Sequence, residues 1–328
     1  MCLKKLVPVV VALMVLATGC ASEDTAAPTP SSTASTSTTT PPTTTVAPTT
    51  PPSLAPTTTV EDQAVNQSPT DIYHRIVGEF LPAGAVTEWE LVYATWEEGP
   101  LTLDMYAPVE SAGAPIVMYF PGRQGYDAPL SMVEGLVEEG AIVFVVRYPL
   151  IRSSHQEMVD GVLGDHGAGA RAVAEGVACA INFAQVRASE LGSDDPVVAL
   201  TGFSAGGGVA AYVALFGADL EARWDEFAAE GGPASQVECV VTDGSTHVDA
   251  LVGMAGGYDL LVPIYDGAYG RAYQQERDPE LWEFLSSSIG VNPDLKVRLI
   301  HGTADWIPVG DAAEFEALLS EAGYDVQF

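Results

Sequence analysis

Residues 202–206 have the sequence Gly-Phe-Ser-Ala-Gly, which places Ser204 between two glycines. The pentapeptide alone is a weak signal, but it follows a predicted buried strand at 197–201 and precedes a predicted apolar helix at 209–216. A sharp turn between a strand and a helix exposes the serine hydroxyl beside the first amides of the helix, and glycines allow the close backbone approach that the turn needs. Ser204 is therefore predicted to be a nucleophile, in preference to a passive serine in a glycine-rich turn.

Strand and helix patterns alternate from about residue 86 onward, which predicts an α/β fold with a mostly parallel central sheet and helices on both faces. Two leading strands, 89–96 and 101–107, are joined by a polar Gly-Pro turn and are expected to pair antiparallel. Further strands are predicted at 115–120, 141–148, 197–201, 250–254, 296–300 and 324–328. Helices are predicted at 130–140, 165–191, 209–216 and 311–322, the last opened by a capping pair of Asp311 and Glu314.

An aromatic-rich segment at 259–295 interrupts this alternation and contains Tyr265, Tyr269, Tyr273 and Trp282. We expect it to form a short cap-like insertion or a pocket wall. Aromatic side chains at this density suit an apolar or aromatic group of a substrate, and they suit the core of a cap equally well.

Three segments, 118–122, 202–207 and 301–305, resemble motifs of the α/β-hydrolase family, especially its small bacterial carboxylesterases and feruloyl-esterase-like enzymes. The resemblance covers about residues 86–328. It implies hydrolysis of a small-molecule carboxylic ester through an acyl-enzyme on Ser204. It also implies that Asp305 orients the catalytic histidine, while Asp259 is the alternative carboxylate and is expected to be structural or pocket-lining. A lactone or peptide hydrolase of the same fold and a catalytically inactive ligand-binding protein are the alternative functions.

The oxyanion hole implied by the resemblance combines two backbone amides, because the charge of a tetrahedral intermediate needs donors that are already in place. One is the amide of Ala205, and the other belongs to Gly122 or Arg123 in the loop after Phe120. The chain departs here from the His-Gly-Gly-Gly run common in such esterases, since residues 120–125 are Phe-Pro-Gly-Arg-Gln-Gly.

The chain departs further from the family pattern at the general base, because no histidine follows Asp305 in the sequence. In the family this histidine follows the last strand, so we expect it beyond Phe328, together with a final helix and the rest of an incomplete last strand. Of the five histidines present, His301 is expected to be structural and His247 is the least implausible substitute base.

The amino-terminal segment has the parts of a secretory signal, with Lys4 and Lys5 before an apolar run that is too short to span a bilayer. Residues 17–20, Ala-Thr-Gly-Cys, resemble a bacterial lipobox, which implies acylation of Cys20; a plain secretory signal is the alternative. The expected organisation is a signal peptide at 1–20, a disordered linker rich in Thr, Pro and Ser at 21–69, and the catalytic domain at 70–328. An extracytoplasmic protein anchored to the membrane by lipid is therefore expected.

Two cysteines, Cys179 and Cys239, belong to the domain, and outside the cytoplasm such a pair suggests a disulfide, with two buried thiols as the alternative. The formal charge of -31 makes binding to nucleic acid unfavourable. Histidines and carboxylates show no spacing typical of a metal site, and the glycines around Ser204 do not form G-x-G-x-x-G. Neither a metal nor a dinucleotide cofactor is expected, and no protein partner is indicated.

Overall fold

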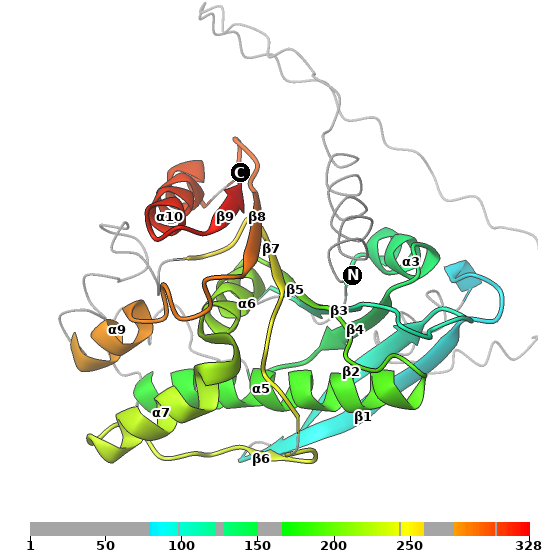
Figure 1. Cartoon of the computed structure of the whole chain (residues 1–328), viewed down its shortest axis with the longest axis horizontal. Helices are drawn as coiled ribbons and strands as arrows, with labels where there is room; N and C mark the ends of the chain where they lie inside the picture. Colours follow the sequence, from blue (N-terminus) through cyan, green and yellow to red (C-terminus); the bar gives the residue numbers. More distant parts are fainter. Residues whose placement is uncertain are drawn as a thin grey trace, which may run out of the picture.

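The computed structural model describes residues 79–97, 99–122, 128–149, 166–242, 244–258, 279–305 and 307–328, and only the backbone of 166–169. Its strands are β1 (Val86–Trp96), β2 (Gly99–Ala107), β3 (Ile116–Phe120), β4 (Ile142–Val146), β5 (Val198–Phe203), β6 (Glu238–Cys239), β7 (Ala250–Met254), β8 (Lys296–Ile300) and β9 (Asp325–Gln327). Within the described residues they form a single sheet in the order β6-β1-β2-β4-β3-β5-β7-β8-β9 (Figure 1).

The strands from β4 to β9 in this order are parallel, and their register aligns their carboxyl ends. Phe120 at the end of β3 pairs with Gly202 of β5. Phe203 pairs with Met254 at the end of β7, which in turn pairs with Ile300 at the end of β8. The loops that follow these strands therefore leave the sheet along one edge, here called the carboxyl edge.

The antiparallel end of the sheet is held by a buried ion pair. β2 lies between β1 and β4 and is antiparallel to both, and β1 has a register shift between Glu88 and Leu91. The amide of Glu90 in this bulge donates to Asp104 Oδ1 at 2.8 Å. Asp104 is fully buried and accepts two hydrogen bonds from Arg147 at 2.9 and 2.6 Å. Because a buried carboxylate needs such partners, this pair fixes β2 against the chain that follows β4.

Helices cover both faces of the sheet (Figure 1). On one face α3 (Leu130–Glu138) packs Val133 and Leu136 into a cluster with residues of β3 and β4 such as Val117 and Val143. The other face carries α5 (His166–Glu190), α6 (Ala205–Phe216) and α10 (Val309–Glu321), which share the larger buried cluster. The mostly parallel sheet and the placement of helices on both faces confirm the predicted fold class.

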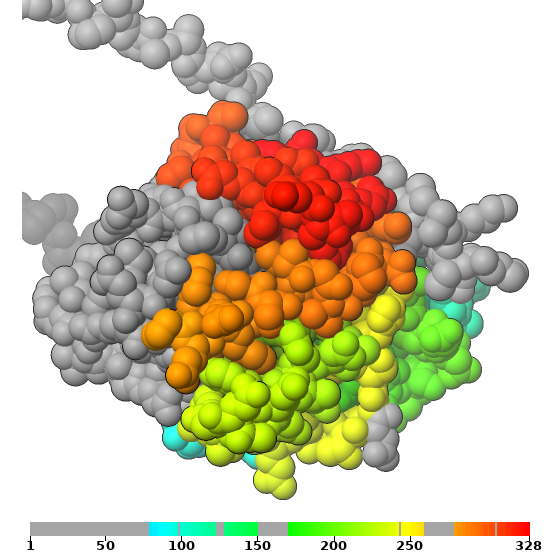
Figure 2. Space-filling model, turned by 60° about the vertical axis from the view of Figure 1, so that its left-hand side comes forward, coloured from blue at the N-terminus to red at the C-terminus, as the bar shows by residue number. Residues whose placement is uncertain are grey.

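A second layer of aromatic side chains lies outside α6. It joins α7 (Leu220–Ala229), which follows the short 3-10 helix η1 (Gly217–Asp219), to α9 (Pro279–Ser286). Phe284 of α9 stacks on Phe227 with ring centroids 4.5 Å apart and meets Trp224 edge-on at 4.6 Å. Figure 2 shows the segment that contains α9 between the α7 segment and the carboxyl-terminal segment. This end of the predicted 259–295 insertion therefore packs on the domain, while 259–278 lie outside the described residues.

Cys179 on α5 and Cys239 on β6 form a disulfide, with Cα atoms 5.2 Å apart and a sequence separation of 60 residues. It attaches the edge strand β6 to the helical layer. The predicted signal peptide, Cys20 and linker lie outside the described residues. Among the described residues, no helix has both the length and the apolar character needed to cross a membrane.

Some predicted element boundaries were wrong. The helix expected at 209–216 begins four residues earlier, at Ala205. The predicted capping pair of Asp311 and Glu314 does not cap α10, since Pro308 is the residue at the N-cap and makes no side-chain cap hydrogen bond. Sequence patterns also missed α7 and β6. The final strand β9 covers three residues and pairs as far as Gln327 with Arg298 of β8.

Candidate active site

Ser204 lies at the turn between β5 and α6 in a backbone conformation that side chains rarely adopt. Its φ is 54° and its ψ is -121°, a region that glycine occupies freely and other L-residues avoid. The residue is half-buried at the carboxyl edge, and in the described part of the chain nothing accepts a hydrogen bond from its hydroxyl. The turn therefore has the strained geometry that presents a serine side chain at the top of a sheet.

Glycines flank this turn because the neighbouring backbone leaves no room for a Cβ atom. A Cβ at Gly206 would lie 2.0 Å from the carbonyl oxygen of Phe120 and 2.5 Å from that of Pro121. A Cβ at Gly202 would lie 2.3 Å from the carbonyl oxygen of Gly206, and one at Gly208 would lie 2.1 Å from that of Gly257. The first turn of α6 is thus pressed against the end of β3 on one side and the loop after β7 on the other.

The loop after β7 holds the Ser204 backbone directly. The amide of Ser204 donates to the Met254 carbonyl at 3.1 Å, and the amide of Gly257 donates to the Ser204 carbonyl at 3.1 Å. Ala255 between them has φ 43° and donates to the Ile300 carbonyl at 2.7 Å. Sequence reasoning missed this support, although the run Gly256-Gly257 directly after a buried strand was a signal that could have indicated it.

Gly122 lies against Ser204 from the β3 side. A Cβ placed on Gly122 would be 3.3 Å from the Ser204 Cβ and 3.3 Å from the Phe203 ring. Among the described residues, neither the Gly122 amide nor the Ala205 amide at the start of α6 has an acceptor. Two of the three predicted oxyanion residues are therefore next to Ser204 with free amides. The third, Arg123, lies outside the described residues.

Asp305 follows β8 at the same edge of the sheet, in a turn in which its amide donates to the Gly302 carbonyl at 3.1 Å. Its Oδ1 accepts a hydrogen bond from the Ile307 amide at 3.0 Å, and the residue is half-buried. Oδ2 accepts no hydrogen bond from the described residues, so within this part of the chain it is available to a second donor. The alternative carboxylate, Asp259, lies outside the described residues.

His247 is wrongly placed to be a substitute base. It precedes β7, whereas Ser204 follows β5, so the two residues lie at opposite edges of the sheet. Its Nε2 is 3.4 Å from Asp249 Oδ1, and its side chain is 51% exposed. At about 3.3 Å per residue, the five residues of β7 separate the two edges by roughly 17 Å. Proton transfer from Ser204 to His247 is therefore excluded.

His301, which follows β8, is bound within its own loop, with Nε2 2.8 Å from the Ile307 carbonyl oxygen. That carbonyl can only accept, so Nε2 carries the proton in this contact. The contact supports the predicted structural role of His301 beside Asp305. Of the remaining histidines, His74 and His155 lie outside the described residues, and the side chain of His166 is not described.

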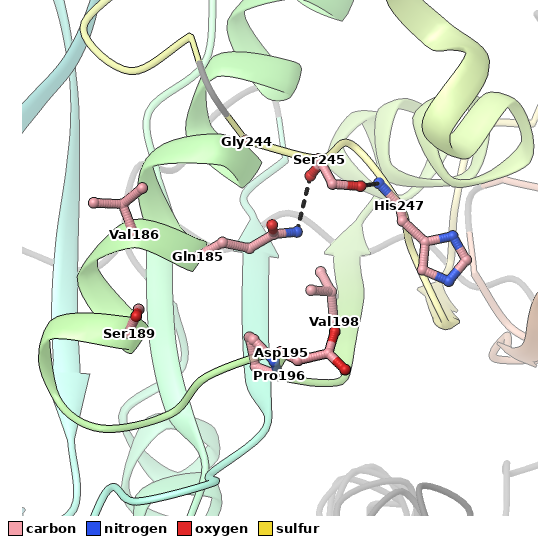
Figure 3. A pocket seen from close by; sticks show the side chains of 9 residues that line it. All are labelled: Gln185, Val186, Ser189, Asp195, Pro196, Val198, Gly244, Ser245 and His247. Atoms are coloured by element: carbon pink, nitrogen blue, oxygen red, sulfur yellow. Dashed lines mark hydrogen bonds between the residues drawn. The ribbon is translucent and has the colours of Figure 1, made fainter.

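A cavity of about 440 Å³ lies at the amino ends of β5 and β7, whereas Ser204 lies at the carboxyl edge of the sheet. Figure 3 shows it between α5 and the loop that leads to β7, where Gln185 donates to the Ser245 carbonyl at 2.8 Å and the Ser245 hydroxyl accepts from the His247 amide at 3.1 Å. These polar groups bind one another. The cavity is separate from the chemistry of Ser204.

The groups gathered at the carboxyl edge suit acyl transfer rather than metal chemistry. The half-buried Ser204 lies there beside the Ala205 and Gly122 amides, which have no acceptor among the described residues, and Phe203, which is 44% exposed, adds an apolar surface beside Gly122. In the part of the chain that the structure describes, no group of three or more histidine, cysteine or carboxylate side chains could hold a metal ion.

Comparison of the fold with solved structures finds similar α/β proteins. A bifunctional GH43-CE protein of Bacteroides eggerthii matches with a TM-score of 0.51 and 18% identity over 74% of this chain and 31% of its own length. Thermogutta terrifontis esterase 2 phosphoramylated by tabun matches with a TM-score of 0.49 and 18% identity, covering 75% of this chain and 81% of its own. A truncated carbohydrate esterase from gut microbiota has a TM-score of 0.49 and 17% identity, covering 76% and 88%.

No protein-family model and no curated protein matches the sequence. The chain spans about a third of the length of the bifunctional protein, and identities this low are evidence of the fold alone. Together with the strand order, the match with a TM-score of 0.51 shows an α/β-hydrolase fold.

Proposed function

We propose that the domain hydrolyses carboxylic esters with Ser204 as the nucleophile. The observation that carries this proposal is the conformation of Ser204, φ 54° and ψ -121°, at a strand-to-helix turn with two free amides beside it. A strained residue persists only where the surrounding structure over-determines it, and such strain is typical of reactive sites. A passive serine would gain nothing from this conformation, because glycine adopts it without strain.

In the proposed reaction the Ser204 oxygen bonds to the acyl carbon while its proton passes to a general base. The developing oxyanion accepts hydrogen bonds from the amides of Ala205 and of Gly122 or Arg123. The bond from the acyl carbon to the alcohol oxygen then breaks, and the alcohol leaves with the proton from the base. A water molecule repeats the sequence on the acyl-enzyme and releases the carboxylic acid, which restores Ser204.

Asp305 is the proposed partner of the general base, a histidine in this mechanism. Its Oδ1 is bound to the Ile307 amide, which fixes the carboxylate, and its other oxygen is available to an imidazole N–H. Of the two histidines whose side chains are described, His247 lies at the other edge of the sheet and His301 binds Ile307. Neither is assigned the role of the base.

The test is hydrolysis of p-nitrophenyl butyrate by protein expressed from the complete coding region. Ser204→Ala should lower kcat by on the order of 10⁴-fold or more, because loss of a nucleophile disables the whole catalytic unit. A fluorophosphonate should label the parent protein once, on the peptide that contains Ser204. Well-folded parent protein that hydrolyses no ester and takes no label would overturn the proposal and favour a ligand-binding role.

Two control variants separate this chemistry from hydrolysis by surface groups. His247→Ala removes an exposed imidazole that could attack an activated ester, and Ser245→Ala removes the hydroxyl in the cavity at the opposite edge. Both variants should keep the parent kcat. If His247→Ala abolished turnover while Ser204→Ala preserved it, the assignment of Ser204 would be wrong.

We further propose that the domain is held on the outer side of a bacterial membrane through an acylated Cys20. The disulfide between Cys179 and Cys239 supports this location, since such bonds persist mainly outside the cytoplasm. Cys20→Ala should abolish incorporation of a labelled fatty acid and release the protein from the membrane fraction. Labelling that survives the substitution would contradict the anchor.

A further inference from the structure

We propose that Tyr148 is a positioning residue that sets the direction of the Gly122 amide in the oxyanion hole. The inference rests on the proposed function and extends it to a residue outside the predicted site. Tyr148 lies two residues beyond the end of β4, the strand next to β3, and is 5% exposed. Its hydroxyl donates a buried hydrogen bond to the Pro121 carbonyl oxygen at 2.9 Å.

The geometry of the peptide bond makes this contact specific. The Pro121 carbonyl and the Gly122 N–H belong to one peptide unit, which is trans and planar, so the two groups point in opposite directions. Fixing the carbonyl oxygen therefore fixes the direction of the amide. Gly122 lies against Ser204, since its Cβ would be 3.3 Å from the Ser204 Cβ, and a rotation of this peptide would therefore change the direction of the donor that we assign to the oxyanion hole.

Packing against α6 also restrains this peptide unit. The absent Cβ of Gly206 leaves room for the carbonyl oxygens of Phe120 and Pro121. The ring of Tyr148 also meets Phe120 edge-on, with centroids 5.9 Å apart and planes at 61°. Packing alone limits translation of the loop, whereas the hydroxyl of Tyr148 provides the directional bond that resists rotation.

Tyr148 is itself anchored and keeps its proton. The neighbouring Arg147 donates its amide to the Thr102 carbonyl at 3.0 Å and pairs with the buried Asp104. Burial raises the pKa of Tyr148 well above its ordinary value, and Tyr119 raises the pKa further. The hydroxyl is therefore a donor throughout the pH range in which a serine hydrolase works.

Tyr148→Phe tests the proposal, and Tyr93→Phe is its matched control. Tyr93 is fully buried, and its hydroxyl donates to the Arg147 carbonyl at 3.1 Å, one residue from Tyr148 and away from Gly122. Each substitution removes one hydrogen bond from a buried tyrosine hydroxyl to a backbone carbonyl, so the two should cost similar stability. Only Tyr148→Phe should lower kcat, by about 10- to 100-fold with KM within twofold, which is less than the loss of a whole oxyanion donor.

A second readout reports on the oxyanion itself. Replacing the carbonyl oxygen of the ester by sulfur removes the strong acceptor, so the ratio of ester to thionoester kcat/KM measures how well the amides are aimed. This ratio should fall severalfold in Tyr148→Phe and stay at the parent value in Tyr93→Phe. Phe120→Leu keeps the hydroxyl bond but removes the ring contact, and it should shift the ratio in the same direction by less.

The outcomes separate this inference from the proposed function. Turnover that depends on Ser204, with the same kcat and ratio in Tyr148→Phe and Tyr93→Phe, would overturn the role of Tyr148 and leave the esterase intact. A parent protein without turnover would overturn both. If Tyr148→Phe does not fold, a ring-fluorinated tyrosine at position 148 keeps the ring and alters only the donor strength of its hydroxyl, and an unchanged ratio in that protein would refute the proposal.

Discussion

Replacing Ser204 by glycine should stabilise the domain relative to Ser204→Ala, although neither variant keeps the proposed nucleophile. Both substitutions remove the hydroxyl, but only glycine adopts φ 54° and ψ -121° without strain. A residue held in such a region costs about 1–3 kcal/mol. Glycine also makes the unfolded chain more flexible, which costs roughly 0.5–1 kcal/mol relative to alanine. The difference leaves Ser204→Gly more stable by about 0.5–2 kcal/mol.

Urea unfolding of the two variants, followed by tryptophan fluorescence, measures this difference. For a domain of this size, it corresponds to a melting temperature higher by about 1–8 °C in Ser204→Gly. Ala222→Gly is the control, because Ala222 lies exposed in α7 with helical geometry. There the change from alanine to glycine should lower the free energy of unfolding by about 0.5–1 kcal/mol. A Ser204→Gly variant no more stable than Ser204→Ala would mean that the turn carries no strain, and the argument for an evolved nucleophile would fail with it.

Three further predictions concern stability. Gly206→Ala should cost several kcal/mol of stability, since its Cβ would lie 2.0 Å from the Phe120 carbonyl oxygen. Gly310 is also the second residue of a helix, but no atom lies within 4 Å of its Cβ position, so Gly310→Ala should gain about 0.5–1 kcal/mol. Equal changes of the two variants in urea unfolding would refute this prediction. Replacing Cys179 and Cys239 together by alanine should lower the free energy of unfolding by about 4 kcal/mol, because the disulfide spans 60 residues; a loss under about 1 kcal/mol in the same assay would contradict the entropic account. Burial raises the pKa of Tyr119 to about 12 from 10.0, so its stabilising contribution is complete below pH 10 and falls as the pH rises toward 12; phenolate absorbance that appears at pH 10 in folded protein would disagree.

The fold was predictable because its signals are local. The parallel strands β3, β4, β5 and β7 are mostly apolar runs of five or six residues, and the bounds of β7 and β8 match the predicted ones. The missed elements lack such signals. β6 is a two-residue pairing that depends on β1, and α7 carries only two buried side chains, Leu220 and Trp224. The first turn of α6 was missed because its run of glycines has low helix propensity, and only packing against β3 and β7 makes it helical.

The candidate site was predictable to the extent that its residues follow strands directly. Ser204 and Asp305 come after β5 and β8, and the register of a parallel sheet brings such positions to one edge. The supporting contacts of Tyr148 and Gly257 could not be predicted in this way. Both contacts are hydrogen bonds to backbone carbonyl oxygens, and any suitably placed donor can make such a bond. The amino-acid types in the sequence therefore do not indicate which residue is the donor.

The strain at Ser204 persists because four backbone hydrogen bonds converge on this one residue. Its amide donates to Met254, and its carbonyl accepts from Gly207 at 3.0 Å, Gly208 at 3.3 Å and Gly257 at 3.1 Å. At about 0.5–1.5 kcal/mol each, these bonds together contribute about 2–6 kcal/mol, which is of the size needed to offset a strain of about 1–3 kcal/mol. Met254 ends β7 and Gly257 lies in the loop after it, so two of the partners are outside α6 and the helix alone does not hold the turn. The conformation of the proposed nucleophile therefore depends on the adjacent ends of β5 and β7 and not on the pentapeptide alone.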